Sequence, residues 1–176
     1  MGGNVGKINL FIAASLDGYI SRPDGSVDWL FTDGDYGYQE FYDSIGTVLM
    51  GRKTYDKVLE FGDYPYEDKR SIIFSRQDPS LQDIDKLEFV SGDIVKFTDS
   101  LRRSESDDFW LVGGSQIIRL FLEQDLIDEI ILSIHPIILG NGIPLFDRIK
   151  KEVRMELIND VSFGSGLVQL HYRILK

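Results

Sequence analysis

One stretch of this chain constrains its fold more than any other: an apolar run that breaks at two glycines and continues as an amphipathic helix. Residues 109–112 are aromatic or aliphatic throughout, which predicts a strand buried on both faces. The apolar residues that follow form one stripe of a helix and are Ile117, Ile118, Phe121 and Leu122. Gly113 and Gly114 let the backbone approach another group closely, and Ser115 is expected to cap the helix. The junction predicts either a phosphate site at a helix N-terminus or a tight turn without a ligand.

The same alternation of strand and helix runs through the whole chain. Strands are expected at residues 7–14, 47–50, 69–74, 87–90, 109–112 and 126–134, and helices at about 36–45 and 93–103, after Gly51 and after Gly114. The runs 154–163 and 167–175, joined by Gly164-Ser165-Gly166, predict a C-terminal antiparallel hairpin. This order predicts one α/β domain over residues 1–176, with a mixed sheet flanked by about four helices.

Charge and composition argue against several classes of function. The formal net charge of −10 argues against nucleic acid or an anionic membrane as partner. The chain has no cysteine and only two histidines, His135 and His171, so no metal site is expected. His135 is expected to end a strand and His171 to face solvent, neither with a catalytic role. No apolar run reaches the ~20 residues that span a bilayer, and the start lacks the form of a signal peptide, so a cytoplasmic protein is expected.

Positive charge nevertheless gathers where two further strands end. Gly51-Arg52-Lys53-Thr54 follows a strand and opens a helix, where two cations oppose the helix dipole unless an anion binds there. Ser75 and Arg76 follow the next strand, at the carboxyl end where open α/β sheets bind ligands. With Gly113-Gly114, these junctions fit a ligand with several separated phosphates, such as the dinucleotide NADPH. The chain has neither the G-x-G-x-x-G fingerprint after an early strand nor a G-x-x-x-x-G-K-[ST] loop.

Acidic residues stand in two of the predicted loops. Asp17, before Gly18, predicts either an Asx-turn or a group beside a ligand at the edge of the sheet. Asp33 and Asp35 precede the helix at 36–45, and either of them would cap it.

Five motifs, in order and at matching spacing, resemble the dihydrofolate reductase superfamily. Residues 48–55 (VLMGRKTY) look like its aliphatic-Met-Gly-Arg-x-Thr-aromatic signature, 72–77 (IIFSRQ) like its third strand and Ser-Arg loop, and 111–117 (LVGGSQI) like its glycine pair before a helix. Residues 15–20 (SLDGYI) and 136–146 (PIILGNGIPLF) resemble more narrowly the C-terminal reductase domain of the bifunctional riboflavin-biosynthesis deaminase/reductase and its stand-alone relatives. The resemblance implies a three-layer dihydrofolate reductase-like fold with a mostly parallel sheet.

The resemblance also implies an oxidoreductase that takes a hydride from NADPH. Its cofactor-binding residues would be Ala13, Gly51, Arg52, Lys53, Thr54, Ser75, Arg76, Val112, Gly113, Gly114, Ser115, Gln116 and Ile117. Gly51 to Thr54 would grip phosphates, Ser75-Arg76 the adenosine 2′-phosphate, and Ser115 to Ile117 the pyrophosphate. Residues 11–14 and the Asp17 loop would flank the nicotinamide and a small-molecule substrate.

The implied reaction is reduction of 5-amino-6-(5-phosphoribosylamino)uracil or another pyrimidine- or pterin-like ring. Dihydrofolate reduction and a non-catalytic nucleotide-binding role are the alternatives. The acid that the superfamily carries early in its first helix falls near Asp35, with Asp33 as an alternative, and Asp17 is a second catalytic candidate. No H-x-E…P-C-x-x-C motif exists, so only the reductase half would be present.

Two further expectations concern the substrate and a partner subunit. A substrate with a ribose phosphate is ordinarily bound by basic residues. The sequence has few candidates for this role beyond Lys7, Arg22 and Lys57. The C-terminal hairpin carries apolar residues on one face and predicts a homodimer formed by edge pairing; these residues are Leu170, Tyr172 and Ile174.

Overall fold

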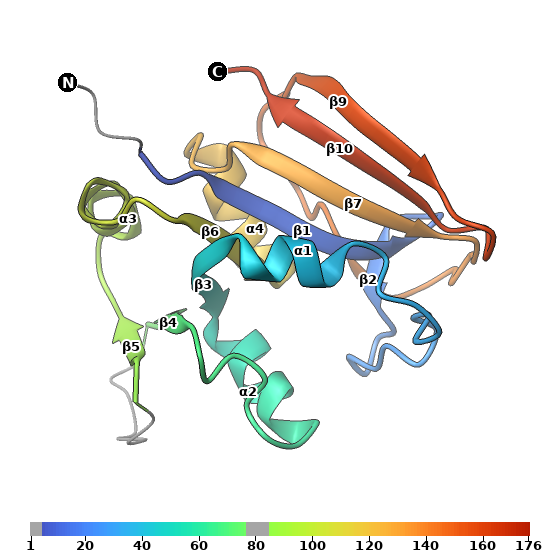
Figure 1. Cartoon of the computed structure of the whole chain (residues 1–176), viewed down its shortest axis with the longest axis horizontal. Helices are drawn as coiled ribbons and strands as arrows, with labels where there is room; N and C mark the ends of the chain where they lie inside the picture. The colour runs from blue at the N-terminus through green and yellow to red at the C-terminus, as the bar shows by residue number, and fades with distance from the viewer. Residues whose placement is uncertain (1–4, 77–84) are drawn as a thin grey trace.

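The computed structural model describes residues 5–76 and 85–176 and shows a large twisted sheet with helices on both sides (Figure 1). The elements of these residues are β1 (Ile8–Ser15), β2 (Tyr19–Ser21), α1 (Tyr38–Asp43), β3 (Ile45–Gly51), α2 (Arg52–Glu60), β4 (Arg70–Phe74), β5 (Leu87–Val90), α3 (Ile94–Ser104), β6 (Asp108–Gly113), α4 (Ser115–Glu123), β7 (Glu129–His135), β8 (Ile143–Pro144), β9 (Met155–Ser162) and β10 (Val168–Ile174). None of the described helices has the length and apolar character needed to cross a membrane.

Eight of the strands form one sheet in the order β5-β4-β3-β6-β1-β7-β10-β9. The pairs from β5 to β7 are all parallel, while β10 is antiparallel to both β7 and β9. This arrangement confirms the predicted fold class, including the C-terminal hairpin. The remaining strands, β2 and β8, pair in a small second sheet that the sequence did not predict, because both are short and lie in segments broken by glycine and proline.

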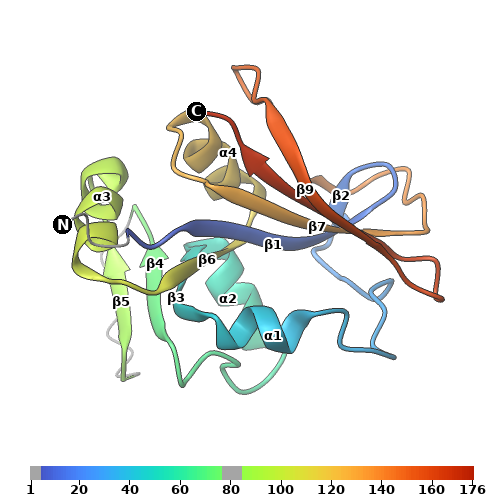
Figure 2. The same ribbon diagram turned by 45° about the horizontal axis from the view of Figure 1, so that its top comes forward.

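The apolar strands are buried on both faces because successive side chains point to opposite sides of the sheet. Leu49 and Ile72 pack into the core beneath α3 and α4, whereas their neighbours Met50 and Ile73 pack beneath α1 and α2. Figure 2 shows the two pairs of helices on opposite sides of the sheet, which gives the molecule three layers.

Helix α1 is shorter than predicted. Tyr36 and Gly37 both have positive φ angles, 51° and 81°, so the helix begins at Tyr38 and not at residue 36. The N-cap residue is Gly37, but Asp35 supports the entry turn because its Oδ1 accepts a hydrogen bond from the N–H of Gln39 at 3.0 Å. Asp33 instead accepts a hydrogen bond from the Tyr36 hydroxyl at 2.7 Å.

Candidate cofactor and substrate cleft

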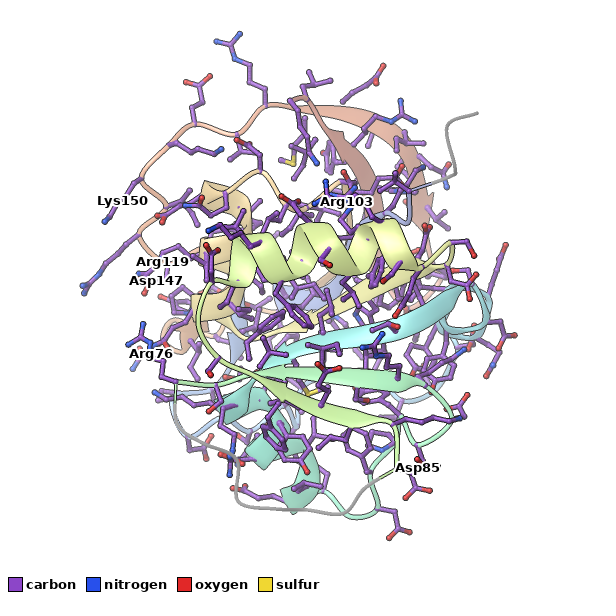
Figure 3. All side chains as sticks on the ribbon, turned by 90° about the vertical axis from the view of Figure 1, so that its left-hand side faces the viewer. Arg76, Asp85, Arg103, Arg119, Asp147 and Lys150 are labelled. Atoms are coloured by element: carbon purple, nitrogen blue, oxygen red, sulfur yellow. The ribbon has the colours of Figure 1, made fainter. Side chains whose placement is uncertain are left out.

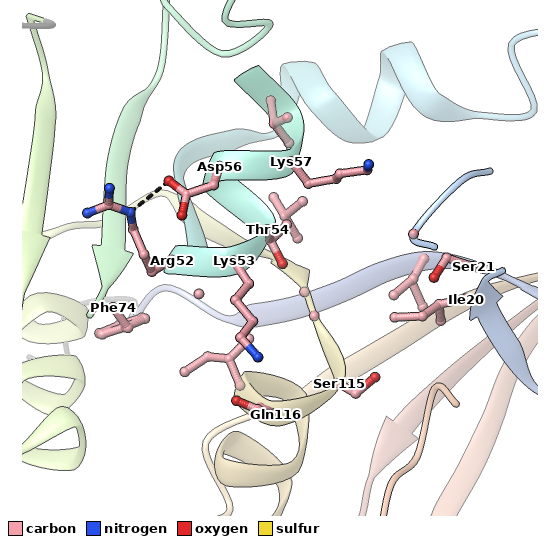
Figure 4. Close-up of a pocket in the computed structure, with 18 of the residues that line it drawn as sticks. Ile20, Ser21, Arg52, Lys53, Thr54, Asp56, Lys57, Phe74, Ser115 and Gln116 are labelled. Atoms are coloured by element: carbon pink, nitrogen blue, oxygen red, sulfur yellow. Dashed lines mark hydrogen bonds and ion pairs between the residues drawn. The ribbon is translucent and has the colours of Figure 1, made fainter. Parts of the chain in front are cut away.

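The sheet order brings the three predicted phosphate-binding junctions together. Strand β3 lies between β4 and β6, and all three are parallel, so their C-terminal ends share one edge of the sheet. These ends carry Gly51 to Thr54, Ser75-Arg76 and Gly113 to Ser115. All three segments line one cleft of about 1660 Å³, part of which is drawn in Figure 4.

Every residue predicted to bind the cofactor lines this cleft. They are Ala13, Gly51, Arg52, Lys53, Thr54, Ser75, Arg76, Val112, Gly113, Gly114, Ser115, Gln116 and Ile117. Gln77, which completes the Ser-Arg motif, lies outside the described residues. The contacts of these residues with a cofactor stay a prediction, but the fold places all of them on one continuous surface.

Two helices begin at the cleft without a side-chain cap. Their N-cap residues are Gly51 for α2 and Gly114 for α4, and neither cap has a side-chain hydrogen bond. A Cβ on Gly114 would lie 3.2 Å from Oγ1 of Thr54, so a glycine at this position lets the two helix starts pack closely. Gly113 has a φ of 127°, which favours glycine, and the 113–114 peptide is cis. The N-terminal N–H groups and dipoles of two helices therefore face one space, which favours an anion there.

Ser115 does not cap α4, and that prediction was wrong. It is the first residue of the helix, is 8% exposed, and donates its hydroxyl hydrogen bond to the carbonyl of Pro144. The hydroxyl therefore ties α4 to β8, and the backbone at the helix start is left open toward the cleft.

Three cations line the same part of the cleft. Arg52 places Nε 2.7 Å from Oδ1 of Asp56, one helical turn away, and its guanidinium lies over the ring of Phe89. Lys53 forms no ion pair with a described residue, and Figure 4 shows it reaching toward Gln116 at the start of α4. Arg76 is exposed after β4 and is likewise unpaired among the residues that the structure describes. These charges line the same cleft as the two helix starts, and Lys53 and Arg76 are not neutralised by a described acid.

A smaller pocket of about 340 Å³ adjoins the cleft and shares with it Phe11, Ala13, Leu30 and Tyr38. Asp35 lines this smaller pocket and is exposed, so the predicted acid of the early helix stands beside the shared residues. Asp33 lines neither space.

Asp17 also lines neither space and holds two loops together. Its carboxylate accepts hydrogen bonds from the hydroxyl of Ser15 at 2.7 Å and from the N–H groups of Leu139 and Gly140 at 3.0 and 2.8 Å. These bonds, that from Ser15 foremost, lower the pKa of Asp17. They join residues 15–20 to residues 136–146, the two motifs of the narrower resemblance. Contact of Asp17 with a substrate stays a prediction.

His135 lines the smaller pocket, a position that the sequence analysis did not assign to it. It ends β7, as predicted, and it is 4% exposed. Its Nε2 accepts a hydrogen bond from the N–H of Phe31 at 3.2 Å, and burial lowers its pKa, so the ring is neutral. The signal in the sequence was its place at the carboxyl end of a central strand, where ligands usually bind.

His171 does not simply face solvent, contrary to the prediction. Its Nε2 lies 2.7 Å from Oε2 of Glu129, a buried carboxylate that also binds Nζ of Lys7 at 2.9 Å. This cluster stands at the start of β7, the end of the strand away from the cleft.

Aromatic side chains form a wall of the cleft that the sequence did not reveal. Phe11, Tyr38, Tyr66 and Trp110 all line it, and the Tyr66 and Trp110 rings meet edge to face at 5.3 Å. Burial raises the pKa values of Tyr38 and Tyr66, so both hydroxyls stay protonated at neutral pH. Phe11 and Tyr38 are the more exposed of the four, so they can stack a planar ring, and Tyr38 can offer it a neutral hydroxyl group.

Comparison with known proteins agrees with this arrangement. Residues 64–169 match the model of the RibD C-terminal domain family. The uncharacterized protein YwjB of Bacillus subtilis (strain 168) is 39% identical over 170 residues, which cover 94% of this chain and 97% of that protein.

Two solved structures are similar to this one. A protein from Shewanella sp. PV-4 named for riboflavin biosynthesis has a TM-score of 0.88 at 30% identity, over 97% of this chain and 99% of that chain. A dihydrofolate reductase from Enterococcus faecalis in complex with NADP(H) has a TM-score of 0.73 at 16% identity, over 98% of each chain, and shares the fold. The chain therefore belongs to the RibD C-terminal domain family and has the dihydrofolate reductase-like fold.

Proposed function

We propose that the protein is an NADPH-dependent reductase that transfers a hydride to a pyrimidine- or pterin-like ring. One observation carries the proposal: one cleft is lined by two uncapped helix N-termini and by Lys53 and Arg76, which form no ion pair with a described residue. In a chain of net charge −10, such a concentration of positive potential fits a polyphosphate ligand.

The residues present fit this cofactor. A Cβ on Gly114 would press on the Thr54 hydroxyl at 3.2 Å, so the glycine lets the two helix starts lie close together at the place proposed for the pyrophosphate. Lys53 and the α2 start would hold phosphates, and Arg76 with Ser75 the 2′-phosphate. Phe11 and Ala13, which line both spaces, would adjoin the nicotinamide. NADPH would supply the hydride, and the task of the protein is to hold donor and acceptor in line.

The smaller pocket is the proposed site of the acceptor ring. Asp35 would accept a hydrogen bond from the ring or relay a proton to it, because its carboxylate lines this pocket. Asp17 would act as a positioning residue by holding the loop of residues 136–142. The family and the fold suggest two reference acceptors, 5-amino-6-(5-phosphoribosylamino)uracil and dihydrofolate, against which rings without an anionic tail are compared.

Cofactor choice tests the proposed role of Arg76. NADPH should raise the melting temperature more than NADH does, because only NADPH carries the 2′-phosphate. Arg76→Ala should shrink this difference, while Arg103→Ala, a matched change of an exposed arginine on α3, should leave it intact (Figure 3). Equal shifts by both cofactors in the unchanged protein would overturn the 2′-phosphate role.

Turnover tests the reaction itself. Oxidation of NADPH, followed by its absorbance, should accelerate in the presence of a pyrimidine or pterin acceptor. Strong turnover of dihydrofolate would favour a folate reductase. Binding of NADPH without hydride transfer to any pterin or aminopyrimidine would show a nucleotide-binding protein without this activity.

A further inference from the structure

The charges of the cleft are divided between its two ends. Lys53 and Arg76 stand free of described acids at the end proposed for the cofactor. The other end is formed by residues 23–25, by the second half of α2 with the loop to Tyr66, and by the smaller pocket. Figure 4 shows Lys57 on the side of Ile20 and Ser21, away from Arg52 and Phe74. This second region, called here the acceptor region, has the opposite balance of charge.

Acids outnumber cations in the acceptor region. Asp24 and Asp63 line the cleft there, and Asp35 lines the smaller pocket. Lys57 is the one lysine or arginine among the described residues that line this region. Its Nζ lies 2.7 Å from Oε2 of Glu60 and 5.8 Å from the centre of the Phe61 ring, so its charge is already compensated.

The other cations considered for a ribose phosphate are engaged elsewhere. Arg22 places Nε 2.6 Å from Oδ1 of Asp28 and does not line the cleft. Lys7 is bound to Glu129 before the start of β1, at the opposite edge of the sheet. Neither residue offers a free positive charge to a substrate.

The groups that remain suit an uncharged ring. Phe11 and Tyr38 present aromatic surface, Tyr66 and Trp110 pack behind it, and the lowered pKa of His135 keeps its ring neutral at neutral pH. Planar heterocycles gain from stacking on such surfaces and from hydrogen bonds to neutral hydroxyls. A phosphate dianion in the same region would lie among several carboxylates without a free cation, and this repulsion disfavours it.

We propose that the hydride acceptor is a planar nitrogen heterocycle, neutral or cationic, that carries no phosphate or other anionic tail. The proposal rests on the reductase function proposed above and narrows its substrate class. It separates this protein from a reductase whose substrate carries a ribose phosphate.

A matched pair of ligands tests it by binding, without the need for turnover. Protein saturated with NADP⁺, so that its phosphate sites are filled, is titrated with 5-amino-6-ribosylaminouracil and with the 5′-phosphate of the same compound. Tryptophan fluorescence provides the signal, because Trp110 lines the cleft and Trp29 contacts His135 beside the smaller pocket. The compound without phosphate should bind at least about tenfold more tightly at low salt, and the ratio should shrink as salt screens the carboxylates.

A variant tests whether the ratio of the two affinities depends on the charges around Lys57. Glu60→Gln releases Lys57 and should improve binding of the phosphorylated compound several-fold, with little change for the other. Asp99→Asn, which removes an exposed acid on α3, should change neither affinity.

Equal or tighter binding of the phosphorylated compound would overturn the proposal, and so would failure of both compounds to bind. Absence of NADPH oxidation with every acceptor would instead contradict the reductase function, while the binding ratio would still be measurable.

Discussion

Gly114 determines how closely the starts of α2 and α4 approach each other. In Gly114→Ala the new Cβ would lie 3.2 Å from Oγ1 of Thr54, so the Thr54 side chain must give way by a few tenths of an ångström and the alignment of the two helix starts is disturbed. We expect the affinity for NADPH to fall about tenfold, as measured by calorimetric titration. Gly164→Ala is the control, because nothing lies within 4 Å of a Cβ placed at that glycine. Equal NADPH affinity in both variants would contradict this role of Gly114.

His135 links the stability of the fold to pH. Its folded pKa lies below the ordinary value because it is buried, and its Nε2 must stay unprotonated to accept the N–H of Phe31. Below about pH 6.5 the unfolded chain binds a proton that the folded chain does not, so this contribution to stability is present at higher pH and is lost as pH falls, by at most ~1.4 kcal/mol per pH unit.

The measurement is urea unfolding between pH 5 and 8. Stability of the unchanged protein should fall more steeply on the acid side than that of His135→Phe, which lacks the titrating ring. Faster hydrogen exchange at the Phe31 amide in acid would locate the effect. Identical slopes for the two proteins would exclude a contribution from His135.

At the scale of elements, Glu129 joins three strands at the end of the sheet away from the cleft. It begins β7, binds Lys7, the residue just before β1, and meets His171 of β10. Burial raises the pKa of this carboxyl, but the hydrogen bonds from Lys7 and His171 outweigh that effect and hold it below its ordinary value. The resulting stabilisation is therefore present above about pH 4.5 and is lost as the pH falls through the lowered folded pKa.

Glu129→Gln should lower the free energy of unfolding at pH 7 by about 1–3 kcal/mol. It should also reduce the loss of stability on acidification, because the group that titrates is gone. The affinity for NADPH should not change, since the cluster stands at the other end of β7. A lower affinity for NADPH in this variant, with unchanged stability, would contradict the prediction and show that Glu129 affects the cleft.

Elements whose residues interact locally were predictable, and side chains with distant partners were not. The apolar strands and the glycines before α2 and α4 are visible in the sequence because periodicity and backbone freedom are local properties. Ser115 finds its acceptor 29 residues away at Pro144, and His135 its donor 104 residues away at Phe31. Asp17 has a local donor in Ser15, but its backbone donor Leu139 lies 122 residues away. Only the tertiary fold decides such pairs. The sequence therefore identified Asp17 and His135 as residues of interest, but it did not predict their hydrogen-bond partners.

For the whole molecule, the edge of the sheet bears on the predicted homodimer. Strand β10 is paired on both sides, so the edge that could accept a second subunit is β9. All eight of its residues are exposed, and the large apolar ones among them are Met155, Leu157, Ile158 and Val161. An exposed apolar edge strand is a template for pairing with another chain.

Light scattering should give the mass of two chains for the unchanged protein and of one chain for Leu157→Lys. Ile138→Lys, at a loop residue that is 69% exposed, is the control and should stay dimeric. A single-chain mass for the unchanged protein would refute the homodimer.

The division of the cleft also bears on how such a protein can diverge. The residues proposed to bind the cofactor lie at the strand-to-helix junctions at Gly51 and Gly113, where the strands β3 and β6 of the packed sheet end. The acceptor region comes largely from loops, residues 23–36 and 61–66, which carry its acidic residues. The two sets of residues belong to different parts of the chain. Substitutions in the loops can therefore change which acceptor binds, while the residues proposed to bind the cofactor stay the same. Substitutions in these loops are therefore expected to change the affinity for the acceptor while leaving the affinity for NADPH nearly constant.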